Sequence, residues 1–259
     1  MVKQLSVLFM LGDGIWEGLR LFNSRFAFLK EHLDRLFESA LATDINFGMD
    51  RKEITEALYK TTLSNGMTDD VHVRLMITRG PKRTPFQDPR LSKDGPTIVI
   101  IPEYKVASEE TTTRGLRLHT VPIHRGLPLT QDPKLNSHSK LNCVLALIHA
   151  LKADADEALM LDPHGFVNTT NSTNFFIVRS GEVWTSTGDY CLNGITRQKV
   201  IDLCCENDIP VFERNFSLVD TYGASEAFVT GTFGAQTLVT EIDGRIIGDG
   251  GQGPIFKRI

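Results

Sequence analysis

The sequence predicts a mixed α+β fold in two domains, and three observations support this prediction. Short apolar runs that are typical of strands alternate with amphipathic segments that are typical of helices. The 259 residues are enough for one large or two medium domains. Residues 124–133 contain two Pro, one Gly and few apolar side chains, as linkers do. We therefore expect one domain over residues 1–123, a linker over 124–133 and a second domain over 134–259.

The first 123 residues contain the patterns of two helices and several strands. Leu33, Leu36, Phe37 and Ala40 recur at helical spacing, and Asp50 with Glu53 three residues later is a capping box. Asn65-Gly66 then ends the second helix. The expected helices are 29–42 and 50–64, and the expected strands are 15–22, 71–79, 97–102 and 116–122, with 26–28 pairing back on the first strand and 80–95 as a loop.

The C-terminal part alternates strands and helices in the same way. Its apolar runs are short and are separated by Gly, Asn and Asp, which are common in turns. The expected helices are 139–153 and 198–207, and the expected strands are 157–162, 175–179, 182–186, 210–215, 226–230 and 238–242.

The composition is that of an ordinary globular protein. Hydrophobic residues make up 41% and charged residues 23% of the chain. A net charge of −4 gives no support for binding to nucleic acid, and no apolar run is long enough to span a membrane. We recognise no signal peptide, and the four cysteines have no C-x-x-C spacing, so we expect reduced thiols and a cytoplasmic location.

The segment Gly194-Ile195-Thr196-Arg197 has the features of an anion site. It precedes the expected helix 198–207, and the glycine allows a ligand to approach the backbone closely. The amides of Ile195 and Thr196 would then be unpaired donors at a helix N-terminus, which is a favourable place for a phosphate. No nucleotide-binding motif accompanies this segment, which favours another phosphorylated ligand.

Two further segments could complete such a phosphate site. Thr230-Gly231-Thr232 ends an apolar strand and could offer amides and hydroxyls, although alone it is equally typical of a polar strand end. Arg35 lies on the amphipathic helix 29–42, where a single arginine is usually solvated. An arginine is also the side chain that pairs with a phosphate dianion through two hydrogen bonds.

Other motifs carry little weight. Residues 248–253 match G-x-G-x-x-G, but too few residues follow for a dinucleotide-binding crossover. The histidines show no metal-binding spacing and are better explained by packing or surface positions, so we expect no metal site. No G-x-S-x-G sequence is present.

Several short motifs, in order along the chain, together resemble the class IV aminotransferases, which are fold-type IV pyridoxal phosphate enzymes. Any one of these motifs would be weak evidence, but their order from residue 11 to residue 253 is a strong signal. The motifs are GDGIWEG (12–18), EHLDRL (31–36), EALMLD (157–162), NFFIV (174–178), LNGITR (192–197), TGT (230–232) and EIDG (241–244).

The resemblance implies a small N-terminal α/β domain, a larger barrel-like C-terminal domain, a homodimer, and pyridoxal 5′-phosphate at the domain boundary. It implies an aminotransferase of the branched-chain or D-amino-acid type, which moves an amino group between an amino acid and a 2-oxo acid. The alternatives are a lyase of the aminodeoxychorismate-lyase type and a relative without transaminase chemistry. The cofactor-binding residues that it implies are Arg35, Gly194, Ile195, Thr196 and Thr232. Arg74 corresponds to an arginine near the substrate, although a structural ion pair is an equally good explanation.

The catalytic lysine is one of two places where the chain departs from this family. The family's Schiff-base lysine usually stands in K-x-x-N before a helix, and Lys140 is our candidate. An alignment without gaps instead places Asn136 in the lysine position, so that Lys140 is about one helical turn late. Lys134 is the second candidate.

The second departure is Thr169, where relatives carry a glutamate that keeps the pyridine nitrogen protonated. Threonine can offer a hydroxyl to the nitrogen but no countercharge, so the cofactor would be a weaker electron sink. Because Asn168, Thr170 and Asn171 are also neutral, we expect no nearby carboxylate to compensate.

Overall fold

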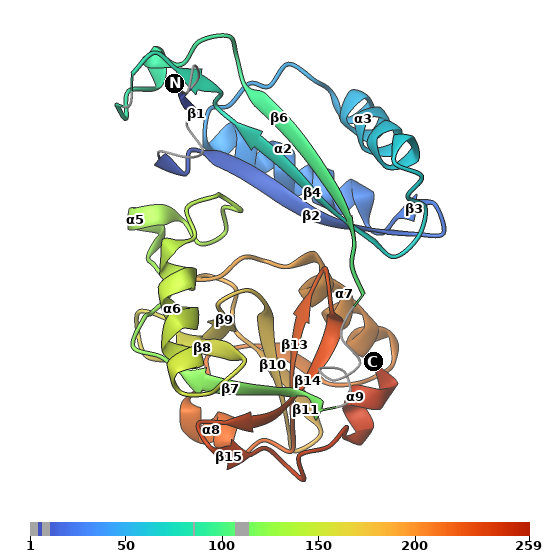
Figure 1. The fold of residues 1–259 in the computed structure, drawn as a ribbon. Helices are drawn as coiled ribbons and strands as arrows, with labels where there is room; N and C mark the ends of the chain where they lie inside the picture. Colours follow the sequence, from blue (N-terminus) through green and yellow to red (C-terminus); the bar gives the residue numbers. More distant parts are fainter. Residues whose placement is uncertain (1–4, 7–10, 85, 107–113) are drawn as a thin grey trace. The chain divides into compact units, whose positions relative to one another are not determined.

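A computed structural model describes residues 5–6, 11–84, 86–106 and 114–259, and the chain forms two compact units (Figure 1). Unit 1 contains Met1–Val106 together with Leu135–Lys140. Unit 2 contains Ala107–Lys134 and Leu141–Ile259. The described parts combine sheets and helices, as the predicted α+β class requires.

The division between the units differs from the expected one. Strand β7 (Leu116–Thr120), which we expected in the first domain, pairs with β8 (Glu157–Leu161) and β14 (Ala235–Ile242) in unit 2. The expected linker 124–133 is also part of unit 2. Hydrogen-bonded strand pairing therefore places the first boundary at Val106, before the stretch whose composition suggested a linker.

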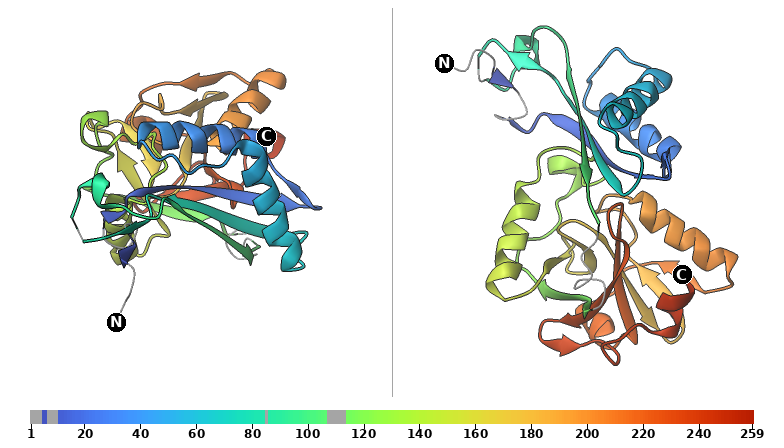
Figure 2. Two further views of the ribbon diagram at one scale, coloured as in Figure 1. Left: turned by 90° about the horizontal axis from the view of Figure 1, so that it is seen from above. Right: turned by 45° about the vertical axis from the view of Figure 1, so that its right-hand side comes forward.

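Unit 1 is built on a sheet with the strand order β3-β2-β4-β6. All of its neighbouring strands are antiparallel. Helices α2 (Leu29–Ala42) and α3 (Arg51–Ser64) cover one face of this sheet, as both views show (Figure 2). The strands are β2 (Gly14–Phe22), β3 (Arg25–Phe26), β4 (Val71–Thr78) and β6 (Thr97–Tyr104).

The covered face follows from the alternation of side chains along each strand. Leu19 of β2 lies directly opposite Val73 of β4, and both are fully buried. Leu36 of α2 and Ile54 of α3 pack onto the same core. The expected capping box is present, because Asp50 accepts a hydrogen bond from the amide of Glu53 and Glu53 accepts one from the amide of Asp50.

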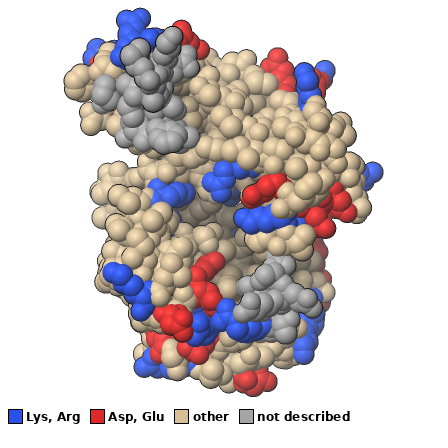
Figure 3. Space-filling view, in the orientation of Figure 1, with Lys and Arg blue, Asp and Glu red and all other residues tan. Residues whose placement is uncertain are grey.

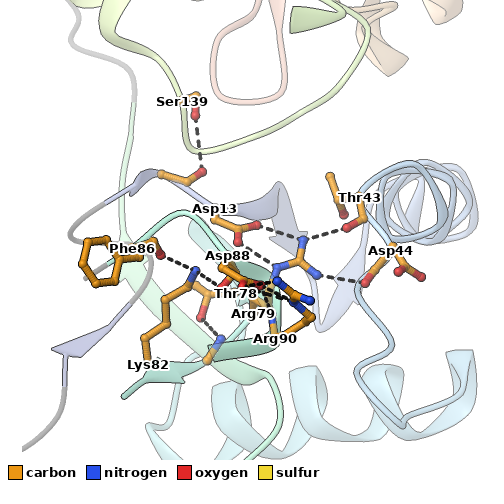
Figure 4. A network of polar contacts seen from close by, with 12 residues as sticks. Asp13, Thr43, Asp44, Thr78, Arg79, Lys82, Phe86, Asp88, Arg90 and Ser139 are labelled. Atoms are coloured by element: carbon orange, nitrogen blue, oxygen red, sulfur yellow. Dashed lines mark hydrogen bonds and ion pairs between the residues drawn. The ribbon is translucent and has the colours of Figure 1, made fainter. Parts of the chain in front are cut away.

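The expected loop 80–95 contains two short elements, β5 (Pro81–Lys82) and the 3-10 helix η1 (Pro89–Leu91). β5 pairs with β1 (Leu5–Ser6). The buried Lys82 donates from Nζ to the carbonyls of Phe86 (2.8 Å) and Asp88 (2.9 Å). Beside it, Arg79 binds Asp13 through Nε at 2.7 Å (Figure 4). The contacts of Lys82 and Arg79 stabilise the segment 80–95, which has few apolar side chains.

Unit 2 is a barrel-like sheet, as the resemblance implied. The order β10-β13-β14-β7-β8-β9 closes on itself, because β9 also pairs with β10, and β11 and β12 extend the sheet beyond β10. Helices α6 (Leu141–Lys152) and α7 (Ile195–Glu206) lie against it (Figure 1). The remaining strands are β9 (Val167–Thr170), β10 (Asn174–Arg179), β11 (Glu182–Thr185), β12 (Val211–Glu213) and β13 (Glu226–Gly231).

Alternate side chains of the unit 2 strands enter two different cores. Phe175 and Val229 belong to a cluster that contains residues from β7, β8, β9 and β14. Phe176 and Phe228 face the other way and stack with ring centroids 5.0 Å apart. They pack with Val200 of α7, so α7 covers this second face.

Several elements of unit 2 were not expected from the sequence. Strand β9 is polar apart from Val167 and has no apolar alternation to reveal it. The other elements are short and receive their stability from tertiary contacts rather than from a periodic pattern. They are α5 (Pro128–Gln131), α8 (Leu218–Tyr222), β15 (Arg245–Ile246) and α9 (Pro254–Arg258).

The surface carries charges of both signs. On the face shown in Figure 3, acidic and basic side chains intermingle over the part of the chain that forms unit 2. This agrees with the small net charge of −4. Among the described residues, no helix has the length and apolar character needed to cross a bilayer.

His72 makes unit 1 sensitive to acid. It lies on β4 with 8% exposure. Burial and the neighbouring Lys105 and Arg74 lower the pKa of His72 from 6.5 to about 4, against the opposing influence of Glu103. The unfolded chain therefore binds a proton below about pH 6.5 that the folded chain does not bind until near pH 4. Stability consequently falls as the pH decreases through this window.

We predict that replacing His72 with Asn reduces the loss of unfolding free energy between pH 7 and pH 5 by about 1–2 kcal/mol. Urea unfolding of wild type and variant at both pH values measures this difference. Thr97→Ser on β6 provides the control, because it changes an exposed side chain that carries no titratable group and should leave the pH dependence unchanged. An unaltered pH dependence in His72→Asn would contradict the assignment.

Candidate functional site

Helix α7 begins at Ile195, three residues earlier than expected, so Ile195 and Thr196 form its first turn. Gly194 is the N-cap residue and makes no side-chain hydrogen bond, and its carbonyl accepts the amide of Gln198. Neither the Ile195 nor the Thr196 amide has an acceptor among the residues that the structure describes. Two donors therefore point out of a twelve-residue helix at its positive end.

Asn174 holds the loop that leads into α7. Its Nδ2 donates to the carbonyl of Leu192 at 2.9 Å. Its Oδ1 lies so close to Gly194 that a Cβ there would be 2.2 Å away. Real Cβ atoms do not approach other heavy atoms so closely, so any side chain at position 194 would displace Asn174 or the loop that it holds. The sequence requires glycine here because the backbone lies directly on a buried amide.

The strand register places two threonines beside Asn174. Asn174 on β10 lies directly opposite Thr169 of β9 and Thr230 of β13. Residues directly opposite one another in antiparallel strands point to the same face of the sheet. This face is the one that α7 covers, because Phe176 lies two residues beyond Asn174. The row Thr169, Asn174 and Thr230 therefore lies next to the N-terminal end of α7.

Thr230 has an unused polar atom. Its side chain is 1% exposed, and its Oγ1 has no hydrogen-bond partner among the described residues. Thr232 follows the end of β13 and is half-buried. A buried hydroxyl without a partner is destabilising unless a ligand or water satisfies it, so the structure here is suited to a polar ligand.

The hydroxyl of Thr169 donates to the backbone carbonyl of Thr173. A carboxylate does lie near this loop, because Glu157 accepts hydrogen bonds from the hydroxyls of Thr170 (2.6 Å), Ser172 (3.0 Å) and Thr173 (3.1 Å). Burial raises the pKa of Glu157, and these hydroxyls oppose that effect. The sequence did not predict the contact between Glu157 and Thr170, because the two residues lie more than ten positions apart in the chain.

In unit 1, Arg35 on α2 contacts the buried carboxylate of Glu17 on β2. Its Nε and one terminal nitrogen bind the two carboxylate oxygens at 2.8 and 2.7 Å. The same carboxylate lies 2.7 Å from Nδ1 of His32. Burial tends to raise the pKa of Glu17, but Arg35 and His32 outweigh this effect and lower it. The sequence did not indicate this partner of Arg35.

Arg74 lies on the face of the unit 1 sheet opposite α2 and α3. Its guanidinium is 4.2 Å from the ring centroid of Trp16, a cation–π contact. The alternative of a structural ion pair finds no carboxylate partner among the described residues. Arg74 is exposed, so its other donors can reach a ligand.

The segment Leu135–Lys140 belongs to unit 1 and runs along β2. Asn136 is 2% exposed, and it donates from Nδ2 to the carbonyl of Trp16 at 2.7 Å. Its Oδ1 has no partner among the described residues. Lys140 immediately precedes α6 and is half-buried. Lys134 is more exposed and pairs with Asp189 at 4.0 Å.

The described residues fit the phosphate-binding part of a pyridoxal phosphate site better than the part that would hold the reactive ring. The α7 amides, the close approach at Gly194 and the unpartnered Thr230 hydroxyl fit a phosphate group. At the two positions where the resemblance led us to expect a lysine and a glutamate, the chain has the buried Asn136 and the neutral hydroxyl of Thr169. Within the described ranges, no cluster of His, Cys, Asp or Glu could bind a metal ion.

Comparison with known proteins gives the same family for most of the chain. The profile described as "Amino-transferase class IV" matches residues 14–242. "Branched-chain-amino-acid aminotransferase-like protein 2" of Arabidopsis thaliana is 41% identical over 248 residues, which are 96% of this chain and 44% of that protein. The chain thus spans less than half the length of this relative. A "Putative branched-chain-amino-acid aminotransferase" of Methanocaldococcus jannaschii is 36% identical over 96% of this chain and 85% of that protein.

A solved structure shows the same fold. The branched-chain aminotransferase of the thermophilic archaeon Thermoproteus uzoniensis, crystallised with norvaline, superimposes with a TM-score of 0.87 and 28% identity. The match covers 99% of this chain and 86% of that chain. Sequence profile, relatives and fold agree, and the chain belongs to the class IV aminotransferase family.

Proposed function

We propose that this protein is a pyridoxal-phosphate-dependent aminotransferase that exchanges an amino group between an amino acid and a 2-oxo acid. The observation that carries the proposal is the N-terminus of α7, where Gly194 lies against Asn174 and two helix amides lack acceptors among the residues that the structure describes. Family membership supplies the cofactor class. The names of the relatives favour branched-chain substrates, so these are the first to test.

The residues of this chain would divide the tasks as follows. The amides of Ile195 and Thr196 and the hydroxyl of Thr232 bind the phosphate, and Arg35 adds positive charge. Thr169 lies beside this anchor and binds the ring nitrogen. Arg74 binds the substrate carboxylate. When bound, the cofactor supplies an aldehyde that captures amines and a ring that withdraws electrons from the adjacent carbon.

Lys140 is our candidate for the lysine that bonds to the cofactor. It is half-buried and lies directly before α6. Asn136 has the better sequence register but cannot form a bond to an aldehyde through its amide nitrogen. A relative without transaminase chemistry is the alternative that Thr169 and the position of Lys140 favour, and a lyase of the same fold is a further alternative.

We predict that borohydride reduction of the protein with pyridoxal 5′-phosphate attaches the cofactor to Lys140, because an amine is needed for covalent capture. Peptide mapping by mass spectrometry identifies the modified residue. Lys140→Ala should abolish the modification, whereas Lys134→Ala should retain it. A cofactor fixed elsewhere would refute the residue assignment, and a protein that never gains cofactor absorbance would refute the proposed function.

The same sample tests the reaction. Spectral conversion of the bound cofactor on addition of L- or D-branched-chain amino acids, followed by reversal with a 2-oxo acid, would support amino transfer. Pyruvate formed from aminodeoxychorismate without an oxo acid acceptor would indicate the lyase instead.

We predict that Gly194→Ala lowers the affinity for pyridoxal 5′-phosphate at least about tenfold, which corresponds to ~1.4 kcal/mol. The added Cβ would lie 2.2 Å from Asn174 Oδ1 and displace the loop that orients the α7 amides. Fluorescence titration with pyridoxal 5′-phosphate and with pyridoxal measures the effect, and only the phosphorylated form should weaken.

Gly126→Ala is the matched control in unit 2, since a Cβ there would meet nothing closer than 3.4 Å. Equal affinity of Gly194→Ala and wild type would show that the phosphate does not bind at α7.

We also propose that the protein forms a homodimer through the exposed side of α6. Leu141, Val144, Leu145, Ile148 and Leu151 follow one another at helical spacing and are 42–70% exposed. The opposite side of α6 packs through Ala146 and Ala150 onto the sheet. A contiguous apolar helix face of this kind is typical of an interface between protein chains.

We predict that the wild-type protein sediments as a dimer and that the double variant Leu145→Glu/Ile148→Glu sediments as a monomer, because two charges would be buried in the interface. Sedimentation velocity at several concentrations measures the state. Val219→Glu on α8, where the native side chain is 77% exposed, should remain dimeric. A monomeric wild type would contradict the proposal.

A further inference from the structure

The hydroxyl of Thr169 can change its hydrogen-bond partner without leaving an unsatisfied group. It donates to the carbonyl of Thr173. That carbonyl also accepts the backbone amide of Thr170 at 2.9 Å. A threonine hydroxyl hydrogen rotates to suit its surroundings. If it turned toward a ligand, the Thr173 carbonyl would keep the amide of Thr170 as its donor.

The carboxylate that contacts this loop cannot serve as a countercharge on the Thr169 side. Successive side chains of a strand point to opposite faces. Thr170 binds Glu157 at 2.6 Å, so Glu157 lies on the face of β9 opposite to Thr169. Three hydroxyl groups also occupy its two oxygens. Thr169 shares its own face with Asn174 and Thr230, which are neutral.

The surroundings of Thr169 therefore favour an uncharged ligand atom that accepts a hydrogen bond. Thr169 is 5% exposed, and a positive charge buried there would lack the negative partner that offsets desolvation. A neutral ring nitrogen needs only one donor, and the rotatable hydroxyl supplies it.

We propose that Thr169 donates its hydroxyl hydrogen to the ring nitrogen of the bound cofactor and that this nitrogen carries no proton at neutral pH. This inference rests on the proposed binding of pyridoxal 5′-phosphate at α7. An uncharged ring withdraws electrons less strongly than a protonated ring. With the cofactor bound, Thr169 would therefore favour reactions that need little electron withdrawal by the ring.

The test is ¹⁵N NMR of the protein loaded with pyridoxal 5′-phosphate labelled at the ring nitrogen. Protonated and unprotonated pyridine nitrogens have well-separated resonances, and this readout does not depend on turnover. We expect the wild-type resonance at the unprotonated position throughout pH 6–8. Thr169→Glu, which introduces a carboxylate, should move it to the protonated position and accelerate amino transfer.

Three variants separate the hydrogen bond from general effects on the fold. Thr169→Ser keeps the donor and should behave as the wild type. Thr169→Val removes it and should weaken cofactor binding about fivefold to tenfold, the loss expected for one neutral hydrogen bond. Thr240→Val, which removes a hydroxyl from β14, should change neither the resonance nor the affinity.

The outcomes distinguish this inference from the function on which it rests. A bound wild-type cofactor with a protonated nitrogen would overturn the role of Thr169 and leave the proposed function intact. The absence of any bound resonance would overturn both. Equal affinities of Thr169→Val and wild type would show that the hydroxyl does not donate to the ring.

Discussion

The contact between Asn174 and Gly194 is the constraint on which the rest of unit 2's polar site depends. Asn174 stands at the start of β10, between β9 and β13, so the sheet register fixes its position from both sides. Its side chain in turn fixes the loop that ends in α7. The barrel thereby determines where the helix amides point, and no long flexible side chain takes part.

This arrangement explains how a protein can retain the cofactor-binding site while its catalytic side chains change. The proposed phosphate contacts come largely from backbone amides, whose position depends on the fold rather than on side-chain identity. The proposed chemistry instead depends on single side chains such as those at positions 136, 140 and 169. A chain that retains the barrel and Gly194 retains the amides proposed to bind the phosphate. Substitutions at the other three positions change the reaction that the bound cofactor can support. Unit 1 differs, because Arg35 is positioned by the buried carboxylate of Glu17.

The sequence predicted the elements whose signal lies in neighbouring residues. Helix α2 agrees with the expected bounds, and the capping box of α3 was identified from Asp50 and Glu53 alone. Strand β9 was missed because its polar residues are stabilised by pairing with β8 and β10. For the same reason, the sequence identified Gly194 as a place of close approach but not Asn174 as the group approached. The Arg35–Glu17 and Glu157–Thr170 pairs and the position of the unit boundary depend on contacts between distant segments, which local patterns do not encode.

The assignment of Leu135–Lys140 to unit 1 bears on how the chain folds during synthesis. Trp16 bonds through its indole to the carbonyl of Ser137, a partner 121 residues later in the chain. The sheet of unit 1 therefore acquires its last edge partner only after the first segment of unit 2, residues 107–134, has been translated. Such long-range pairing is slow to form, and the β2 edge is exposed until then. The two units are thus not two consecutive segments of the chain. A nascent chain that ended before residue 135 would lack the last segment of unit 1.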